Sequence, residues 1–246
     1  MEEQPDEKLL VLVNRLKQEK YPDADSLLLA GSVIRGEATS TSDLDIIVLY
    51  PELPNAYRDS YYYDNWPVEA FVHDLQTLTY FIDEIDAPTG VPSLATMVDD
   101  GKSVPSATEL SKSAKVLAQA SLRKGPEPWS IQTVNSARYM ITDLIEDLKD
   151  SRNATESQAI ASVLYSTIAD FYFRIHGFWS AKGKTIPRRL RKVDPGFAER
   201  FEKAFSAVFL KNESQALISL VSDLLAPHGG PLFSGHRLEA PEEWRK

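Results

Sequence analysis

The chain has 246 residues, of which 43% are hydrophobic and 26% charged, a composition typical of a soluble globular protein. Asp and Glu number 36 against 27 Lys and Arg, and the resulting formal net charge of -9 argues against a general nucleic-acid binder. The absence of cysteine excludes disulfides, zinc–thiolate sites and thiol nucleophiles.

The N-terminus gives no sign of a targeting segment. Its first seven residues, MEEQPDE, are acidic where a secretory signal would be basic. The longest apolar runs are far shorter than the roughly 20 residues that span a bilayer. We therefore predict a cytoplasmic protein without a membrane partner.

Gly and Pro residues break the chain at 125–128, and the charge balance changes at the same point. Residues 1–124 hold 11 basic and 21 acidic residues, a net charge of -10, whereas residues 125–246 hold 16 and 15, a net charge of +1. Chance variation of surface charge is the alternative explanation. We predict two domains, 1–124 and 125–246.

The first of these regions shows short strand signals between helical ones. Leu9, Val13 and Leu16 recur at helical spacing and predict an opening helix that Pro22 ends. Short apolar runs predict strands at 27–30, 44–50 and 68–73. Helices are expected at 33–37, 75–85 and 107–123. Residues 51–66 show no clear periodicity, and Gly and Pro interrupt 88–105.

The second region carries helical periodicity and few strand signals. We predict helices at 134–148, 156–176, 195–209 and 214–225. The aromatic run at 171–173 is expected in the core of the resulting bundle. The chain therefore combines an α/β or α+β domain with a helical bundle.

Two carboxylates of the second predicted strand carry the first chemical signal. Side chains at i and i+2 of a strand share a face, so Asp43 and Asp45 point the same way while Leu44 and Ile46 enter the core. Such a pair must raise a pKa, share a proton or hold a cation, and Mg²⁺ is the natural choice for oxygen ligands. The alternative is that Asp-x-Asp only serves a turn where the strand begins.

A Gly-Ser pair follows the first predicted strand. Gly31 and Ser32, at a helix start, would expose backbone N–H groups and a hydroxyl to an anion, although most such pairs are only turns. Their place one strand before the paired carboxylates puts a phosphate-binding turn beside a metal site. Phosphoryl and nucleotidyl transfer need this combination.

A third acid interrupts the next strand. Val68, Ala70 and Val72 face one side of it and Glu69 the other, where an acid without a partner is costly to bury. Glu69 either joins the other two carboxylates or lies in solvent on an edge strand.

Together, Gly31-Ser32, Asp43-x-Asp45 and Glu69 resemble the signature of the nucleotidyltransferase superfamily with the DNA polymerase β-like fold. The fuller strings GSVIRGE at 31–37 and SDLD at 42–45 are similar to those of bacterial aminoglycoside- and lincosamide-type nucleotidyltransferases. The resemblance is strong over about residues 20–75. In the helical half it is weaker, at Arg138-Tyr139…Thr142-Asp143-Leu144 and Lys182-Gly183-Lys184.

The resemblance implies an α+β fold, with a small mixed-sheet catalytic domain at 1–124 and an all-α domain at 125–246 that binds substrate or closes as a lid. Asp43 and Asp45 would bind two Mg²⁺ ions and Glu69 one of them. The nucleotide, most simply ATP, would be bound by residues of both halves: Gly31, Ser32, Arg35, Ser42, Lys182 and Lys184.

Two regions of the chain offer a carboxylate that could deprotonate the acceptor hydroxyl. The resemblance offers Glu69 or a carboxylate of the helical half, where Asp143, Glu146 and Asp147 are candidates and Asp143 is the one we assign as catalytic. A solvated acidic face is the alternative for these helical residues. The basic cluster at 182–192 has alternatives too, a solvated face or a nucleic-acid patch, and the overall acidity argues against the patch.

We therefore predict a Mg²⁺-dependent nucleotidyltransferase that moves AMP from ATP onto a hydroxyl of a small molecule, such as an aminoglycoside- or lincosamide-like compound, and releases pyrophosphate. Its partners would be the nucleotide and the acceptor, without nucleic acid, and a homodimer is kept as a hypothesis. The rivals are an antitoxin-like or regulatory module and a protein AMP-transferase, both acting on a protein. Retention of three carboxylates with Gly31-Ser32 favours an active enzyme.

Overall fold

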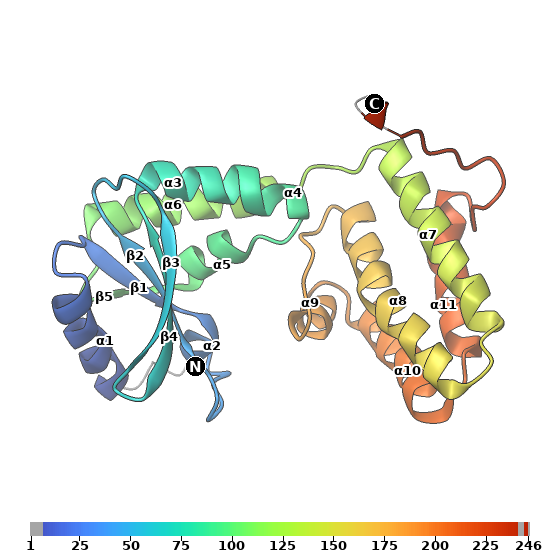
Figure 1. The fold of residues 1–246 in the computed structure, drawn as a ribbon, viewed down its shortest axis with the longest axis horizontal. Helices are drawn as coiled ribbons and strands as arrows, with labels where there is room; N and C mark the ends of the chain where they lie inside the picture. Colours follow the sequence, from blue (N-terminus) through green and yellow to red (C-terminus); the bar gives the residue numbers. More distant parts are fainter. Residues whose placement is uncertain (1–6, 241–243, 246) are drawn as a thin grey trace. The chain divides into compact units, whose positions relative to one another are not determined.

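The structure, a computed structural model, describes residues 7–240 and 244–245. This part of the chain divides into two compact units between Gly125 and Pro126. The first unit combines a sheet with helices and the second is helical (Figure 1). The predicted α+β fold class is confirmed.

The first unit contains the following elements in chain order: α1 (Glu7–Lys20), β1 (Ser26–Ala30), α2 (Gly31–Ile34), β2 (Leu44–Leu49), β3 (Tyr57–Tyr63), β4 (Trp66–His73), α3 (Leu75–Tyr80), the π-helical stretch η1 (Phe81–Asp86), α4 (Ala87–Thr89), α5 (Ser93–Asp100), β5 (Lys102–Val104) and α6 (Glu109–Lys124).

Within the described residues the strands form one five-stranded sheet in the order β3-β4-β2-β1-β5. β2 and β4 run parallel, and the other neighbours are antiparallel, so the sheet is mixed as predicted. β3 and β4 form a hairpin whose turn residues, Asp64 and Asn65, both have left-handed backbone with φ of 49° and 65°. This is the backbone of a type I′ turn, which matches the twist of the two strands.

Each face of the sheet is covered by helices. On one face α1 buries Leu9, Val13 and Leu16 against alternate residues of the central strands, such as Leu44 and Ile46. On the other face Ile47 and Leu49 pack with α3, α5 and α6 (Figure 1). Strands β1 and β2 in the middle of the sheet are therefore buried on both faces over most of their length.

Several elements lie where the sequence predicted none. β3 falls in the stretch without periodicity, because most of its residues are exposed and only Tyr61 and Tyr63 at its end pack on the core, too few to impose alternation. α5 and β5 lie in the region that Gly and Pro interrupt. α2 begins at Gly31, two residues before the predicted helix at 33–37, which was wrong in its bounds.

The second unit consists of helices: α7 (Ile131–Lys149), α8 (Ala154–Ile175), α9 (Thr185–Val193), α10 (Pro195–Lys211), α11 (Gln215–Leu225) and the short 3₁₀ turn η2 (Ala226–His228). Four match predicted helices within a few residues, and α9 was not predicted.

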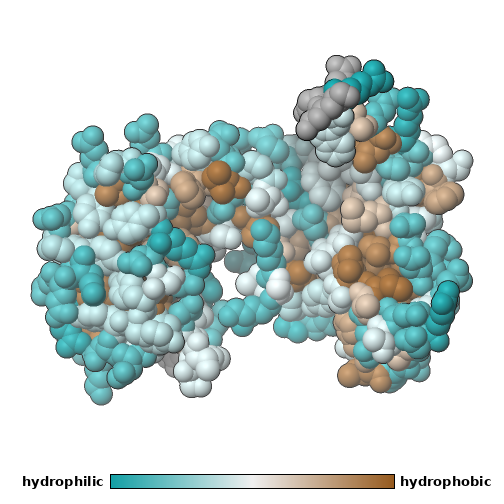
Figure 2. Space-filling model, in the orientation of Figure 1, coloured by the Kyte–Doolittle hydropathy of each residue, from teal (hydrophilic) through white to brown (hydrophobic). Residues whose placement is uncertain are grey.

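The core of this unit is aromatic. Phe171 and Phe173 of α8 are fully buried with Phe201 and Phe205 of α10, as expected for the run at 171–173. Figure 2 shows hydrophobic residues that also reach the visible surface of this unit. None of the described helices has the length and apolarity needed to cross a membrane.

The segment after η2 is held against α7. The Arg138 guanidinium donates to the carbonyl of Gly230 from Nε at 3.0 Å and from Nη2 at 2.7 Å. The Leu232 N–H donates to the Thr142 hydroxyl at 3.0 Å, and His236 stacks on Tyr139 with ring centroids 4.3 Å apart. Arg138, Tyr139 and Thr142, singled out in the sequence, thus fasten the C-terminal segment to the bundle.

His73, at the end of β4, is buried among apolar groups. Its side chain is 3% exposed, its Nδ1 has no hydrogen-bond partner, and its ring meets that of Phe81 edge-on at 5.0 Å. Burial disfavours the charged imidazolium and lowers the pKa of His73 to about 4, against an upward effect of Asp74.

We predict that His73 makes the fold sensitive to mild acid. Because the folded state holds the pKa below the unfolded value of 6.5, stability is complete above about pH 6.5 and is lost as the pH falls toward 4. The loss is on the order of 3 kcal/mol. Denaturant unfolding of the wild type and His73→Gln at pH 8 and pH 4.5 measures it. The difference in unfolding free energy between the two proteins at pH 8 gives the cost of the substitution in packing alone. Equal losses on acidification in both proteins would refute the prediction.

Candidate metal centre

The pairing of β2 with β4 sets two carboxylates side by side. Asp45 lies opposite Glu69 in the parallel register, and both belong to interior strands. Asp43 stands one residue before β2. Ligand oxygens of Asp43, Asp45 and Glu69 all lie within 4.8 Å of one another, and all three residues are partly buried. The alternative that Glu69 lies on an edge strand is wrong, because β3 covers that side of β4.

The cluster is electrostatically unfavourable as it stands. Burial is the main cause that raises the pKa of Asp45 to about 6, and the charges of Asp43 and Glu69 add to it, while Arg35 and Arg58 act in the opposite direction. The turn that precedes the pair is closed by other residues: the Ser42 N–H donates to the Thr39 carbonyl at 3.0 Å, and the Thr39 N–H donates to the Ser42 hydroxyl at 2.8 Å. The three carboxylates are an all-oxygen donor set, which fits a hard divalent cation such as Mg²⁺.

Gly31 is required by the close approach of Asp45. Ala30 pairs with Asp45 across β1 and β2, which brings the next residue, Gly31, against the carboxylate. A Cβ at Gly31 would lie 2.0 Å from Asp45 Oδ2, and the backbone there has a left-handed φ of +75°. Only glycine meets both conditions without strain.

Residues 11–87 match the family model described as "Nucleotidyltransferase domain". These residues form a nucleotidyltransferase domain. The match contains Gly31, Ser32 and the three carboxylates, and it confirms the superfamily to which the sequence motifs pointed.

One solved structure with a similar chain is described as a nucleotidyltransferase-like protein from Exiguobacterium sibiricum. It is 13% identical, with a TM-score of 0.42, over 89% of this chain and 75% of that chain. No curated protein matches the sequence.

The hydroxyl groups of Ser32 and Ser42 are hydrogen-bonded to each other, and Ser42 directly precedes Asp43 in the chain. Ser32 Oγ donates to Ser42 Oγ at 3.3 Å, and the Thr39 N–H donates to Ser42 Oγ at 2.8 Å. The loop at 39–42 thus holds Ser42, the residue before Asp43, next to Ser32. Their contact with phosphate oxygens stays a prediction.

Arg35 lies close to this loop but is engaged by two acids. Its guanidinium is 3.4 Å from Glu37 and 3.5 Å from Asp100, and its side chain is 37% exposed. These ion pairs are long and partly solvated, so they are weak. Its nucleotide-binding role stays a prediction.

Sequence reasoning missed Arg58, which pairs with Glu69. The Arg58 guanidinium of β3 contacts the Glu69 carboxylate and lies over the Phe71 ring, 4.9 Å from its centroid. It was missed because β3 itself was not predicted. The Asp64-Asn65 turn between Tyr63 and Trp66 is a hairpin signal that could have revealed the strand.

The remaining predicted residues belong to the helical unit, where their roles stay predictions. Asp143 is exposed on α7, and its neighbour Glu146 is ion-paired with Lys149 at 2.7 Å. Lys182 and Lys184 are exposed in the loop that leads into α9. The rest of the basic cluster forms one side of α9, while Ile186 and Leu190 form its buried side.

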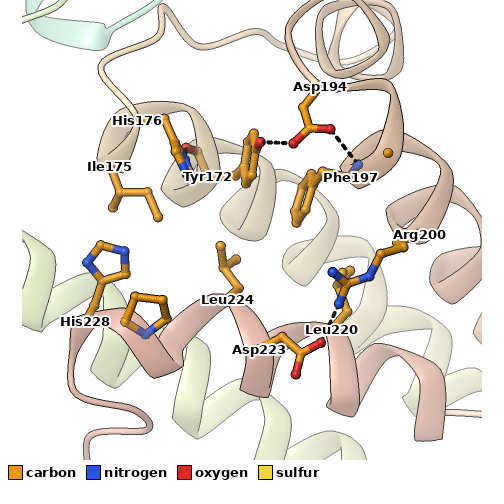
Figure 3. A pocket seen from close by; sticks show the side chains of 12 residues that line it. Tyr172, Ile175, His176, Asp194, Phe197, Arg200, Leu220, Asp223, Leu224 and His228 are labelled. Carbon is orange, nitrogen blue, oxygen red and sulfur yellow. Dashed lines mark hydrogen bonds and ion pairs between the residues drawn. The ribbon is translucent and has the colours of Figure 1, made fainter.

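The helical unit also contains a pocket of about 710 Å³ between the ends of α8, α10 and α11 (Figure 3). One wall is the stacked pair of Tyr172 and Phe197, with centroids 3.7 Å apart. The Asp194 carboxylate accepts hydrogen bonds from the Tyr172 hydroxyl at 2.6 Å and from the Phe197 N–H at 2.9 Å. These hydrogen bonds, the second from the first turn of α10, lower the pKa of Asp194. Polar groups that line the pocket are therefore already bonded to one another, as are Asp223 and Arg200 in their ion pair.

We predict that Gly31→Ala is strongly destabilising for two separable reasons. Left-handed backbone costs an alanine roughly 1–2 kcal/mol, and its methyl group would collide with the Asp45 carboxylate. Gly36→Ala is the matched control, since Gly36 also has left-handed backbone (φ 66°) but is exposed.

Chemical denaturation of a double-mutant cycle with Asp45→Ala separates the two costs. Gly31→Ala should cost more than Gly36→Ala in the wild type, and markedly less once the Asp45 carboxylate is removed. Additive effects in the cycle would show that the carboxylate does not require glycine.

Proposed function

We propose that this chain is a Mg²⁺-dependent nucleotidyltransferase that transfers AMP from ATP to a hydroxyl group of a small molecule. The observation that carries the proposal is the cluster of Asp43, Asp45 and Glu69 on neighbouring strands of a nucleotidyltransferase domain. Partly buried carboxylates that repel one another do not stabilise packing, and a divalent cation would relieve the repulsion.

Each residue of the site has a proposed role in binding the metal ions or the nucleotide. Asp43, Asp45 and Glu69 would hold the metal ions, of which the resemblance to the superfamily implies two. Metal ions at such a site neutralise charge on the phosphates and on the leaving pyrophosphate. The hydroxyls of Ser32 and Ser42 bind phosphate oxygens, with Arg35, Lys182 and Lys184 as the proposed cationic contacts and the Gly31 backbone close to the nucleotide.

The reaction balances without a further reactant. The acceptor oxygen bonds to the α-phosphorus as the bond from that phosphorus to the β-phosphate bridging oxygen breaks, and pyrophosphate leaves with the electron pair. The hydroxyl proton passes to a carboxylate, for which Glu69 and Asp143 are the two proposed acceptors. Separate amide variants of the two distinguish them by which one alters the pH dependence of turnover.

The acceptor is proposed to be an aminoglycoside- or lincosamide-like compound bound by the helical unit, so that 1–124 acts as the catalytic domain and 125–246 as the substrate domain. The aromatic pocket of the helical unit supports a ligand-binding role, because the stacked rings of Tyr172 and Phe197 offer an apolar wall for a ring-shaped ligand. The cytoplasmic location and the homodimer stay predictions.

We predict that the protein transfers label from α-³²P-ATP to members of an aminoglycoside and lincosamide panel in Mg²⁺. Asp43→Asn should lower the rate at least a hundredfold, because it removes a charged metal ligand and keeps the side chain's shape. Asp59→Asn is the matched control, since Asp59 is an exposed acid of β3 outside the cluster. Thin-layer chromatography and mass spectrometry measure the products.

No transfer to any acceptor, together with no Mg–ATP binding by calorimetry, would contradict the proposed function. Label found on protein instead of small molecules would overturn the acceptor class and favour a protein AMP-transferase. Equal activity of Asp43→Asn and Asp59→Asn would remove the metal-site assignment.

A further inference from the structure

We propose that Arg58 is the internal counter-ion of the metal centre, paired with Glu69 in the metal-free protein and displaced from it when a divalent cation binds. The inference rests on the proposed function, because it needs the carboxylate cluster to be a metal site. Arg58 would thus be a positioning residue that sets the metal affinity and keeps the empty cluster stable.

The register of the hairpin places Arg58 at the cluster. Ser60 lies opposite Glu69 and Arg58 lies opposite Phe71 in the antiparallel pairing of β3 with β4. Residues that oppose each other share a face of the sheet, so Arg58 is the diagonal neighbour of Glu69 on the same face. A long side chain spans this diagonal, and the guanidinium contacts the Glu69 carboxylate.

An aromatic ring fixes where the guanidinium lies. The Arg58 guanidinium carbon is 4.9 Å from the centroid of Phe71, whose ring packs on the core shared with α3, α5 and α6. The cation–π contact therefore holds the charge over a fixed ring, and from there it reaches Glu69. This charge also acts on Asp45, since Arg58 is one of the two cations that oppose the rise in the pKa of Asp45.

The ion pair and a metal ion compete for the same carboxylate. The Arg58 contact is made to Glu69 Oε2, and Glu69 is one of the three residues whose oxygens converge. A cation bound by all three must share or take over that oxygen, and it is also repelled by a guanidinium left beside it. Both effects weaken metal binding.

The pair is weak enough to be displaced. The side chains of Arg58 and Glu69 are 56% and 30% exposed, so solvent screens their attraction. A divalent ion held by three carboxylates has the larger charge and more ligands. The ion pair therefore moderates the metal affinity without preventing binding.

The proposal predicts two effects of opposite sign for Arg58→Gln. With EDTA, the melting temperature should fall, because the carboxylates lose their cation. The affinity for Mn²⁺, measured by calorimetry or by the electron paramagnetic resonance of free Mn²⁺, should rise about two- to tenfold. Arg58→Lys keeps the charge and should lie close to the wild type in both measurements.

Arg15→Gln is the matched control, because Arg15 forms an exposed ion pair with Asp64 in the hairpin turn, outside the cluster. Its Mn²⁺ affinity should equal that of the wild type. A loss of stability in Arg58→Gln with unchanged or weaker Mn²⁺ binding would overturn the proposal and leave Arg58 a structural residue.

A different result is expected if the three carboxylates do not bind a metal ion. In that case the wild type would bind Mn²⁺ no better than Asp43→Asn, and the Arg58 proposal would fall with the proposed function. Wild-type binding that Asp43→Asn abolishes, without tighter binding in Arg58→Gln, would overturn the Arg58 proposal alone.

Discussion

The mutual repulsion of Asp43, Asp45 and Glu69 is the constraint on which the rest of the site depends. Parallel pairing of β2 with β4 holds two of these acids in register, and the strand entry adds the third. Both strands are interior and apolar elsewhere, so the backbone cannot move to separate the charges. The domain remains folded despite this unfavourable electrostatic energy, because apolar packing on both faces of the sheet stabilises the strands.

The surroundings of the cluster follow from that constraint. Gly31 has no side chain because the Asp45 carboxylate occupies the space where a Cβ would lie. Arg58 and Arg35 supply positive charge from two separate elements, Arg58 from the edge strand β3 and Arg35 from the end of α2. The site is thus arranged around negative charge that the protein's own cations balance only in part.

The sequence predicted the parts of the site that lie on buried elements. β1, β2 and β4 are apolar runs, and an acid within such a run is conspicuous, so Asp45 and Glu69 could be found without a structure. Arg58 could not, because β3 is an exposed edge strand whose composition lacks alternation. α9 was missed for a related reason, since its many charges hid the short apolar side of Ile186 and Leu190. Which residues pair across neighbouring strands depends on the whole fold and cannot be read from the local sequence pattern.

The most direct test of the central claim is to locate the metal. Crystals grown with Mn²⁺ and a non-hydrolysable ATP analogue allow anomalous difference maps at the manganese edge. We expect peaks between the carboxylates of Asp43, Asp45 and Glu69, with the triphosphate beside Ser32. Bound nucleotide with no anomalous peak at these carboxylates, or with a peak at another set of residues, would contradict it.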